Sequence, residues 1–201
     1  DVVIHSALTK ANLMFNKQLA IDKTSVKSVA WSPLSRDMFV VAHASGNAYV
    51  YNSKFTEQQP LSLSENMQSK AGEYYCLQAK SSNSNPVTQY HFSASAINDM
   101  RFSPNGSYLA VVSSDGYLRV IDYLTSQLVV VFKSYYGALT CCCWSPDGRY
   151  IVTGGEDDMI SVFDFTSRCL LARGIGHSSY ISSVIFDPVE CNNEQYQSMG
   201  W

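Results

Sequence analysis

Apolar and polar positions alternate in short stretches along this chain, and tight-turn sequences separate the stretches. The clearest example begins with the apolar residues 139–144, which are followed by the turn sequence Ser-Pro-Asp-Gly at 145–148. Residues 149–153 alternate between outward and inward positions, 154–158 form a second turn sequence, and 159–163 alternate again. Proline presets one backbone dihedral of a turn and glycine allows the positive one. The pattern therefore predicts three short strands joined by two tight turns.

The same pattern is repeated elsewhere in the chain. Residues 29–52 and 100–122 repeat it in full, and residues 184–188 repeat its opening. One aromatic anchor closes the first strand of each copy, and the four anchors are Trp31, Phe102, Trp144 and Phe186. Their spacings of 71, 42 and 42 residues indicate a repeat of 42 residues with one insertion of 29. A period of about 40 to 45 residues with several strands per unit is typical of a propeller blade, so we expect an all-β propeller of four-stranded blades.

The spacing of the anchors divides the chain into blades. We expect the end of a preceding blade, a blade carrying the insertion at about 53–86, two regular blades and the start of an incomplete one, at 1–22, 23–92, 93–132, 133–173 and 174–201. Within the insertion, residues 73–80 and 87–92 have the composition of strands, whereas 55–71 reads as a polar loop. The chain would supply four to five blades of a complete propeller of seven, and we interpret it as part of a longer protein.

Charge and composition exclude several classes of partner. A net charge of −3 with 15% charged residues provides no basic face, so we expect no nucleic-acid binding. The longest apolar run, 128–132, is far shorter than the roughly 20 residues that cross a bilayer, and we expect no membrane partner. Six cysteines, three of them consecutive at 141–143, lack the spacing of a zinc site. They read as small buried side chains in a reducing compartment, the cytoplasm or nucleus.

The sequence offers little catalytic chemistry. It contains four histidines, and no nucleophile elbow, Cys-His protease signature or phosphate-binding loop is present. Glu156, Asp157 and Asp158 lie on a turn, where a structural or solvated role outweighs a metal site, although these acids could help to orient a basic partner. We therefore expect no catalytic residue, no metal and no cofactor.

The repeat resembles that of the WD-repeat family, whose units run from a Gly-His pair to a Trp-Asp pair. Gly176-His177 matches the first pair, but the Trp of the second is replaced throughout. The turn aspartate that bonds this histidine in the family corresponds to Asp115 and Asp157, and to Ser45 in the first complete blade. The histidine position holds, in order, Asp22, Ser93, Tyr135 and His177. The resemblance thus implies that the internal polar network is degraded in most blades, and that stability depends more on apolar packing.

A closer resemblance is to the WD repeat-containing protein 20 branch, which is related to the fungal catabolite repression protein C. The segments that carry it are 39–47, 133–137, 143–158 and 172–177. This branch consists of cofactors of ubiquitin-specific proteases. The resemblance therefore implies a non-catalytic scaffold that binds such a protease and raises its activity allosterically, with a second WD-repeat protein as a further partner in the complex.

The resemblance also implies which residues touch the protease. In the family, aromatic residues in loops that enter the first strands of neighbouring blades dock on the enzyme, and the matching positions are Tyr136 and Tyr180, with Tyr135 and Ser179 beside them. A tyrosine provides a large contact area at low entropic cost, which suits an interface. The alternative is that both tyrosines pack within the edge of their blades.

Three other hypotheses stay open at this point. A generic WD-repeat adaptor of another complex would have no effect on a deubiquitinating enzyme. A propeller enzyme would require titratable groups with perturbed pKa values around its central channel. A fragment whose natural partner surface has been cut away would show neither property.

Overall fold

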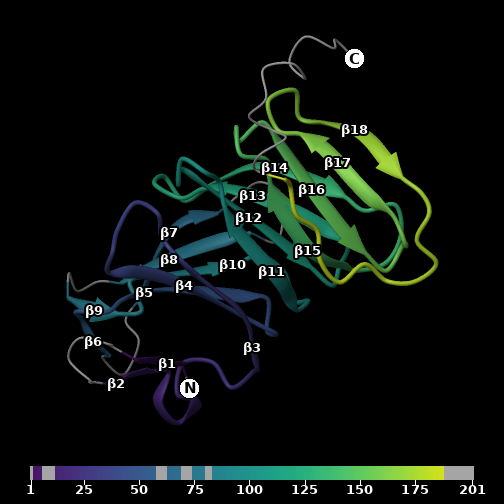
Figure 1. Ribbon diagram of the computed structural model, residues 1–201. Coiled ribbons are helices and arrows are strands. Elements are labelled where there is room, and N and C mark those ends of the chain that lie inside the picture. Colours follow the sequence, from purple (N-terminus) through teal and green to yellow (C-terminus); the bar gives the residue numbers. More distant parts are fainter. Residues whose placement is uncertain (1, 6–11, 58–62, 69–73, 80–82, 188–201) are drawn as a thin grey trace. The chain divides into compact units, whose positions relative to one another are not determined.

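Antiparallel β-sheet makes up nearly all of the regular structure in the computed structural model (Figure 1). The structure describes residues 2–5, 12–57, 63–68, 74–79 and 83–187. Within these ranges the only helix is a single 3-10 turn at Lys17–Leu19. The predicted all-β class is confirmed.

The third blade forms where the sequence pattern is clearest. Its four strands are β15 (Leu139–Trp144), β16 (Tyr150–Gly155), β17 (Ile160–Asp164) and β18 (Cys169–Gly174), and they pair in chain order. The β15–β16 turn is closed by the hydroxyl of Ser145, which accepts a hydrogen bond from the Tyr150 amide at 2.8 Å. The Gly148 amide donates to the Ser145 carbonyl at 2.9 Å, with a positive φ of 72° at the glycine. These are the strands and turns that the pattern predicts.

The second blade repeats this arrangement and shares a core with the third. Its strands are β11 (Ile97–Phe102), β12 (Tyr108–Ser113), β13 (Tyr117–Asp122) and β14 (Gln127–Lys133). The residues of the shared core come from both blades: Ala110, Val112, Leu118, Val120, Phe132, Leu139, Cys142, Trp144, Ile151 and Phe163. Strands β12 and β15 contact each other, so the first strand of one blade packs against the preceding blade.

The first blade is wider than predicted because part of the insertion joins its sheet. The sheet contains β3 (Val26–Trp31), β4 (Met38–His43), β5 (Asn47–Asn52), β10 (Thr88–His91), β8 (Tyr75–Ala79) and β7 (Leu63–Gln68), in that spatial order. Strand β7 falls within the segment expected to be a polar loop, and pairing with β8 makes it a strand. The short strands β6 (Thr56–Glu57) and β9 (Ser84–Asn85) form a separate parallel pair.

The segments before the first blade and after the third form less structure. Strands β1 (Val2–His5) and β2 (Asn12–Phe15) make a two-stranded sheet. Residues 175–187 contain no strand, so the strand predicted around Phe186 does not form within the described part of the chain. The remainder of the predicted 174–201 unit lies outside the described residues.

The four aromatic anchors are not equivalent. Trp144 is buried and donates its indole N–H to the Arg101 carbonyl at 3.0 Å, whereas Trp31 is 48% exposed. Phe102 and Phe186 are half-buried. The repeat position therefore predicts the place of an aromatic residue in the strand but not its burial.

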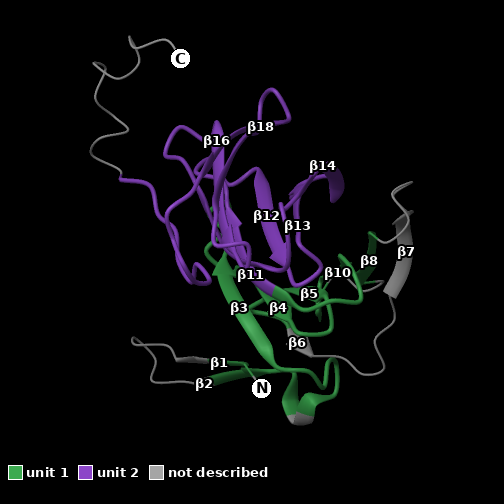
Figure 2. Ribbon diagram, turned by 90° about the vertical axis from the view of Figure 1, so that its right-hand side faces the viewer, with its two compact units in different colours: residues 1–97 green, residues 98–201 purple. Residues whose placement is uncertain are grey.

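The chain divides into two compact units, residues 1–97 and 98–201 (Figure 2). The first unit holds an aromatic core that includes Phe15, Phe39, Tyr49 and Tyr51. The second holds the core shared by the two regular blades. The described residues contain no helix with the length and hydropathy of a transmembrane segment.

Candidate partner-binding surface

The two tyrosines predicted to touch a partner are among the most exposed large side chains in the second unit. Tyr136 is 73% exposed and Tyr180 is 66% exposed. The predicted neighbours Tyr135 and Ser179 are also exposed. We call these four residues the tyrosine surface. Within the described part of the chain, both tyrosine side chains are therefore exposed, as a partner contact requires.

Tyr136 lies in the loop between β14 and β15, and hydrogen bonds hold this loop at both ends. The hydroxyl of Ser134 donates to the Gly137 carbonyl at 2.9 Å, and Gly137 has a positive φ of 65°. The Ala138 carbonyl then accepts from the Glu156 amide at 2.9 Å, and the Ala138 amide donates to Glu156 Oε2 at 3.1 Å. The loop is thereby attached to the turn between β16 and β17.

Tyr180 lies in the segment after β18, which returns to the same turn. The amide of Ile181 donates to the Gly155 carbonyl at 3.1 Å, and the Ile181 side chain is buried. The Thr140 hydroxyl donates to the Ile181 carbonyl and to the Gly154 carbonyl, the latter at 3.0 Å. Tyr180 is therefore fixed one residue before an anchored position.

The structure thus brings Tyr136 and Tyr180 to one rim of the third blade. The residues that follow them, Ala138 and Ile181, bond to the consecutive residues Glu156 and Gly155. Sequence reasoning did not find this connection. The Gly154-Gly155 pair at the end of a strand was the available signal, since glycine there often marks a close backbone approach.

Tyr135 is less free than its neighbour. The guanidinium carbon of Arg173 lies 5.1 Å from the centre of its ring, in the geometry of a cation–π contact. One face of the Tyr135 ring is thus partly covered by β18, and Tyr136 and Tyr180 are the better candidates for insertion into a partner.

The acidic turn between the tyrosine loops is held by internal contacts. Asp157 accepts a hydrogen bond from the Met159 amide at 3.2 Å, and Asp158 adopts a left-handed φ of 57°. Glu156 binds the Ala138 amide, as described above. Among the described residues no group of three or more His, Cys, Asp or Glu side chains is arranged to hold a metal ion.

The repeat aspartates find partners other than histidine. Asp115 accepts a bidentate pair from Arg119, at 3.2 and 2.7 Å, and a hydroxyl bond from Ser113 at 2.7 Å. Burial favours a raised pKa at Asp115, but the bonds from Arg119 and Ser113 outweigh it and hold the pKa below its ordinary value. His177 is exposed and bonds to no residue within the described ranges.

The expectation of a degraded network is wrong for the first blade, where the two polar positions are exchanged. Asp22 stands at the histidine position and Ser45 at the aspartate position, and the Ser45 hydroxyl donates to Asp22 Oδ2 at 2.5 Å. Thr24 donates its amide and hydroxyl to Asp22 Oδ1 at 2.8 and 2.7 Å, and the Tyr49 hydroxyl donates to Oδ2 at 3.3 Å. Both oxygens of the buried Asp22 carboxylate therefore accept hydrogen bonds from donors of the same blade.

His43, on β4, completes this network as a neutral side chain. Its Nδ1 lies 3.3 Å from the Thr24 carbonyl, which can only accept, so Nδ1 carries the proton. Nδ1 is also 3.7 Å from Asp22 Oδ1, the distance of an ion pair. Burial nevertheless lowers the pKa of His43 by more than Asp22 raises it. We regard the contact as one between a carboxylate and a neutral imidazole.

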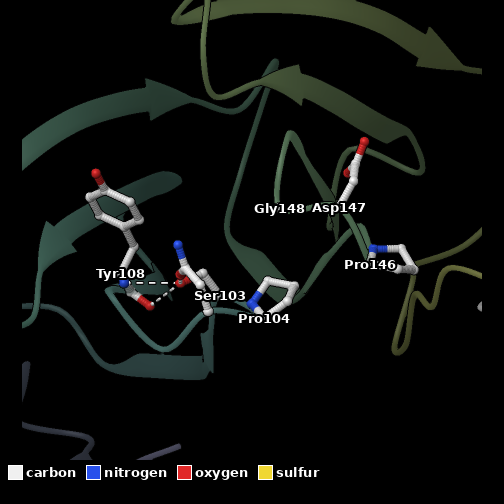
Figure 3. A pocket seen from close by; sticks show the side chains of 7 residues that line it. Ser103, Pro104, Tyr108, Pro146, Asp147 and Gly148 are labelled. Atoms are coloured by element: carbon white, nitrogen blue, oxygen red, sulfur yellow. Dashed lines mark hydrogen bonds between the residues drawn. The ribbon is translucent and has the colours of Figure 1, made fainter. Parts of the chain in front are cut away.

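One pocket lies between equivalent turns of the two regular blades (Figure 3). Its volume is about 370 Å³, and its walls are Ser103, Pro104, Asn105, Tyr108, Pro146, Asp147 and Gly148. The polar groups of Ser103 are used to close its own turn, because its hydroxyl accepts from the Tyr108 amide at 2.9 Å and donates to Asn105 at 2.7 Å. We assign no ligand to this pocket.

Three of the five cysteines in the described part of the chain are buried side chains. Cys76, Cys141 and Cys142 are buried free thiols, Cys143 is half-buried and Cys169 is exposed. Burial raises the pKa of the Cys142 thiol well above its ordinary value. A thiol kept protonated in this way is a poor nucleophile and a poor metal ligand.

Comparison with known proteins agrees with this geometry. Residues 84–122 and 126–164 match the WD40 family, described as WD domain, G-beta repeat. Each match ends with the third strand of a regular blade, at Asp122 and Asp164, so each repeat begins ahead of the first strand of its blade.

One curated relative covers almost the whole chain. The chain is 35% identical, over 98% of its length, to the UBP9-binding protein bun62 of Schizosaccharomyces pombe. It spans 38% of the length of that relative.

Two solved structures show a similar fold. A crystal structure of RRP9 WD40 repeats and a structure of U3-55K match with TM-scores of 0.58 and 0.57. In each case the identity is 11%, and the match covers 79% of this chain and 41% of the other. This likeness concerns the fold alone, and it confirms the predicted propeller of WD repeats.

Proposed function

We propose that this chain, a β-propeller fragment of which residues 84–122 and 126–164 match the WD40 repeat, is a non-catalytic scaffold that binds a ubiquitin-specific protease. The observation that carries the proposal is the identity of 35% along 98% of the chain to a protein named for binding UBP9. The chain spans 38% of that relative, so the shared segment is a candidate for the part that binds.

The tyrosine surface supports a specific place for this contact. Tyr136 and Tyr180 are exposed aromatic side chains on loops whose following residues are anchored to one turn. Aromatic residues of this kind dominate the binding energy of many interfaces, because they bury a large area and lose little rotamer freedom. Both rings would enter the partner from the same rim of the third blade.

We further propose that the scaffold raises the activity of the protease by preferring its active conformation. A binding partner changes an equilibrium only through a difference in affinity for the two states. The scaffold would therefore bind the catalytically competent form more tightly, and a second WD-repeat protein could join the same complex. The free thiols among the described residues suit action in the cytoplasm or nucleus.

A double substitution tests this proposal. The measurement is hydrolysis of a ubiquitin conjugate by UBP9 of Schizosaccharomyces pombe and by other ubiquitin-specific proteases, with and without the scaffold. We expect stimulation by the native scaffold and loss of stimulation with the Tyr136→Asp, Tyr180→Asp variant, because two charges replace the aromatic contact. Binding should weaken by more than 100-fold, or about 3 kcal/mol.

Leu124→Asp is the matched control. Leu124 is 72% exposed, close to the 73% of Tyr136, but it lies in the β13–β14 turn at the opposite end of the strands. The control variant should bind and stimulate like the native protein. If no protease binds the native scaffold, the proposal fails and a generic WD-repeat adaptor becomes the better hypothesis.

A further inference from the structure

We propose that Gly154, Gly155 and Glu156, which we call the positioning segment, fix the two tyrosine loops in their binding arrangement. The purpose of this arrangement rests on the proposed function, but the arrangement itself is a property of the free protein. The segment lies at the end of β16 and the start of the following turn. None of its three residues belongs to the tyrosine surface.

Glu156 holds the loop of Tyr136 by its backbone and its side chain together. Its amide donates to the Ala138 carbonyl at 2.9 Å, and its Oε2 accepts from the Ala138 amide at 3.1 Å. Both polar groups of the Ala138 backbone are thus bound by one residue. Gly137 lies against the same side chain, since a Cβ built on it would be 3.0 Å from the Cβ of Glu156.

The two glycines let both loops approach the strand closely because they have no side chains. A Cβ on Gly155 would meet the Ala138 carbonyl oxygen at less than 3.0 Å, and a Cβ on Gly154 would meet the Ile181 side chain equally closely. The Gly155 carbonyl also accepts from the Ile181 amide at 3.1 Å. Only residues without a side chain allow Ala138 and Ile181 to approach this strand from either side.

This arrangement reduces the cost of binding. A loop that is ordered only in the complex loses conformational freedom when it binds, and this loss is subtracted from the affinity. Here the residues that follow the two tyrosines are already hydrogen-bonded in the free protein. The positioning segment therefore acts on affinity through Tyr136 and Tyr180 without touching the partner.

The test compares Glu156→Ala with Glu156→Gln in the full chain. Glutamine keeps an oxygen that can accept from the Ala138 amide, whereas alanine removes it. We measure hydrogen exchange of the Ala138 amide in the free protein and the Kd for UBP9. Glu156→Ala should accelerate exchange at Ala138 and weaken binding about five- to tenfold, as loss of one hydrogen bond would. Glu156→Gln should restore both to near the native values.

The glycine variants test the second half of the inference. Gly155→Ala should displace the Ala138 loop and Gly154→Ala the Ile181 segment, and each should weaken binding with Tyr136 and Tyr180 intact. Gly174→Ala is the matched control, since a Cβ there would lie 3.6 Å from its nearest neighbour, at ordinary contact distance.

The outcomes separate this inference from the proposed function. Unchanged exchange at Ala138 in Glu156→Ala overturns positioning, whatever the protease does. Equal weakening by the alanine and glutamine variants overturns it as well, because the charge of Glu156 and not its hydrogen bond would then matter. If UBP9 binds none of the proteins, the proposed function fails for this protease, and the exchange measurement alone still decides whether Glu156 positions the loop.

Discussion

At the scale of single residues, the first blade keeps its polar network by exchanging two side chains. Asp22 accepts hydrogen bonds from Ser45, Thr24 and Tyr49 inside the first unit. Burial alone would raise the pKa of Asp22, but the bonds from Ser45 and Thr24 outweigh burial and lower it. His43 is kept neutral beside this carboxylate, chiefly by burial.

These two shifts predict how stability depends on pH. Folded His43 has a pKa below its ordinary value of 6.5. Below about pH 6.5 the unfolded chain therefore binds more protons than the folded chain, and the free energy of unfolding decreases as the pH decreases. The contribution of Asp22 is fully present above its ordinary value of 3.8 and is lost only as pH falls through the lowered pKa. We therefore expect stability to decline first below about pH 6.5 and again below about pH 4.

His43→Asn isolates the first of these two steps. Asparagine retains a donor for the Thr24 carbonyl but does not titrate, so the dependence of stability on pH just below about 6.5 should flatten in denaturant titrations. The stability of His43→Asn relative to the native protein at about pH 8, where an imidazole with an ordinary or lowered pKa is neutral, serves as the reference. An unchanged slope in His43→Asn would show that His43 does not carry this pH dependence.

At the scale of elements, equivalent repeat positions contribute unequally to stability. Trp144 is 6% exposed and makes an edge contact with Phe165 at 5.2 Å between ring centres, whereas Trp31 is 48% exposed. Both residues end the first strand of their blade. The repeat alone would predict the same cost for losing either of them.

Chemical denaturation of two alanine variants measures this difference. Trp144→Ala should lower the free energy of unfolding by about 3–5 kcal/mol, because it opens a cavity in the shared core and leaves the Arg101 carbonyl without its donor. Trp31→Ala should cost less than about half as much, since its ring is already partly in water. Equal losses for the two variants would contradict the observed burial.

The elements were predictable where turn chemistry and alternation agree. The expected strands at 139–144, 149–153 and 159–163 correspond to β15, β16 and β17 within one or two residues. Strand β7 was not predictable, because its sequence Leu-Ser-Glu-Asn-Met-Gln lacks a clear alternation and it is a strand through its pairing with β8. Such pairing is a tertiary effect that local pattern does not contain.

At the scale of the whole molecule, substitutions in the tyrosine surface should weaken binding of the protease and leave the stability of the fold almost unchanged. Tyr136 and Tyr180 are exposed, so their replacement by Asp should change the free energy of unfolding by less than about 0.5 kcal/mol each. A bound protease stabilises only a scaffold that it recognises, by about 2.7 kcal/mol at 100 times the Kd.

A thermal shift assay tests this separation directly. The melting temperature of the native protein should rise with added UBP9, whereas that of the double tyrosine variant should start at the same value and stay there. A variant that melts much earlier without protease would contradict the surface position of the two rings. The Leu124→Asp control should respond to UBP9 as the native protein does.

The anchoring of the two tyrosine loops could not be predicted from the sequence, and the contact role of their tyrosines stays a prediction. Resemblance to a family singled out Tyr136 and Tyr180, and the exposed rings agree with a contact role. The contact of Ile181 with Gly154 joins positions 27 residues apart, and no local signal specifies it. The same holds for Arg173, which covers Tyr135 from another strand.

The exchange of Asp22 and Ser45 also has a consequence for the substitution of either residue. Compared position by position with the family, the first blade shows two unrelated losses, a missing histidine and a missing aspartate. In the molecule, these two positions form one bonded pair, 2.5 Å apart, with the acid moved to the opposite side. Asp22→His alone would remove the acceptor of the Ser45 hydroxyl, and Ser45→Asp alone would place a second carboxylate beside Asp22. We therefore expect the effects of the two substitutions on stability to be non-additive.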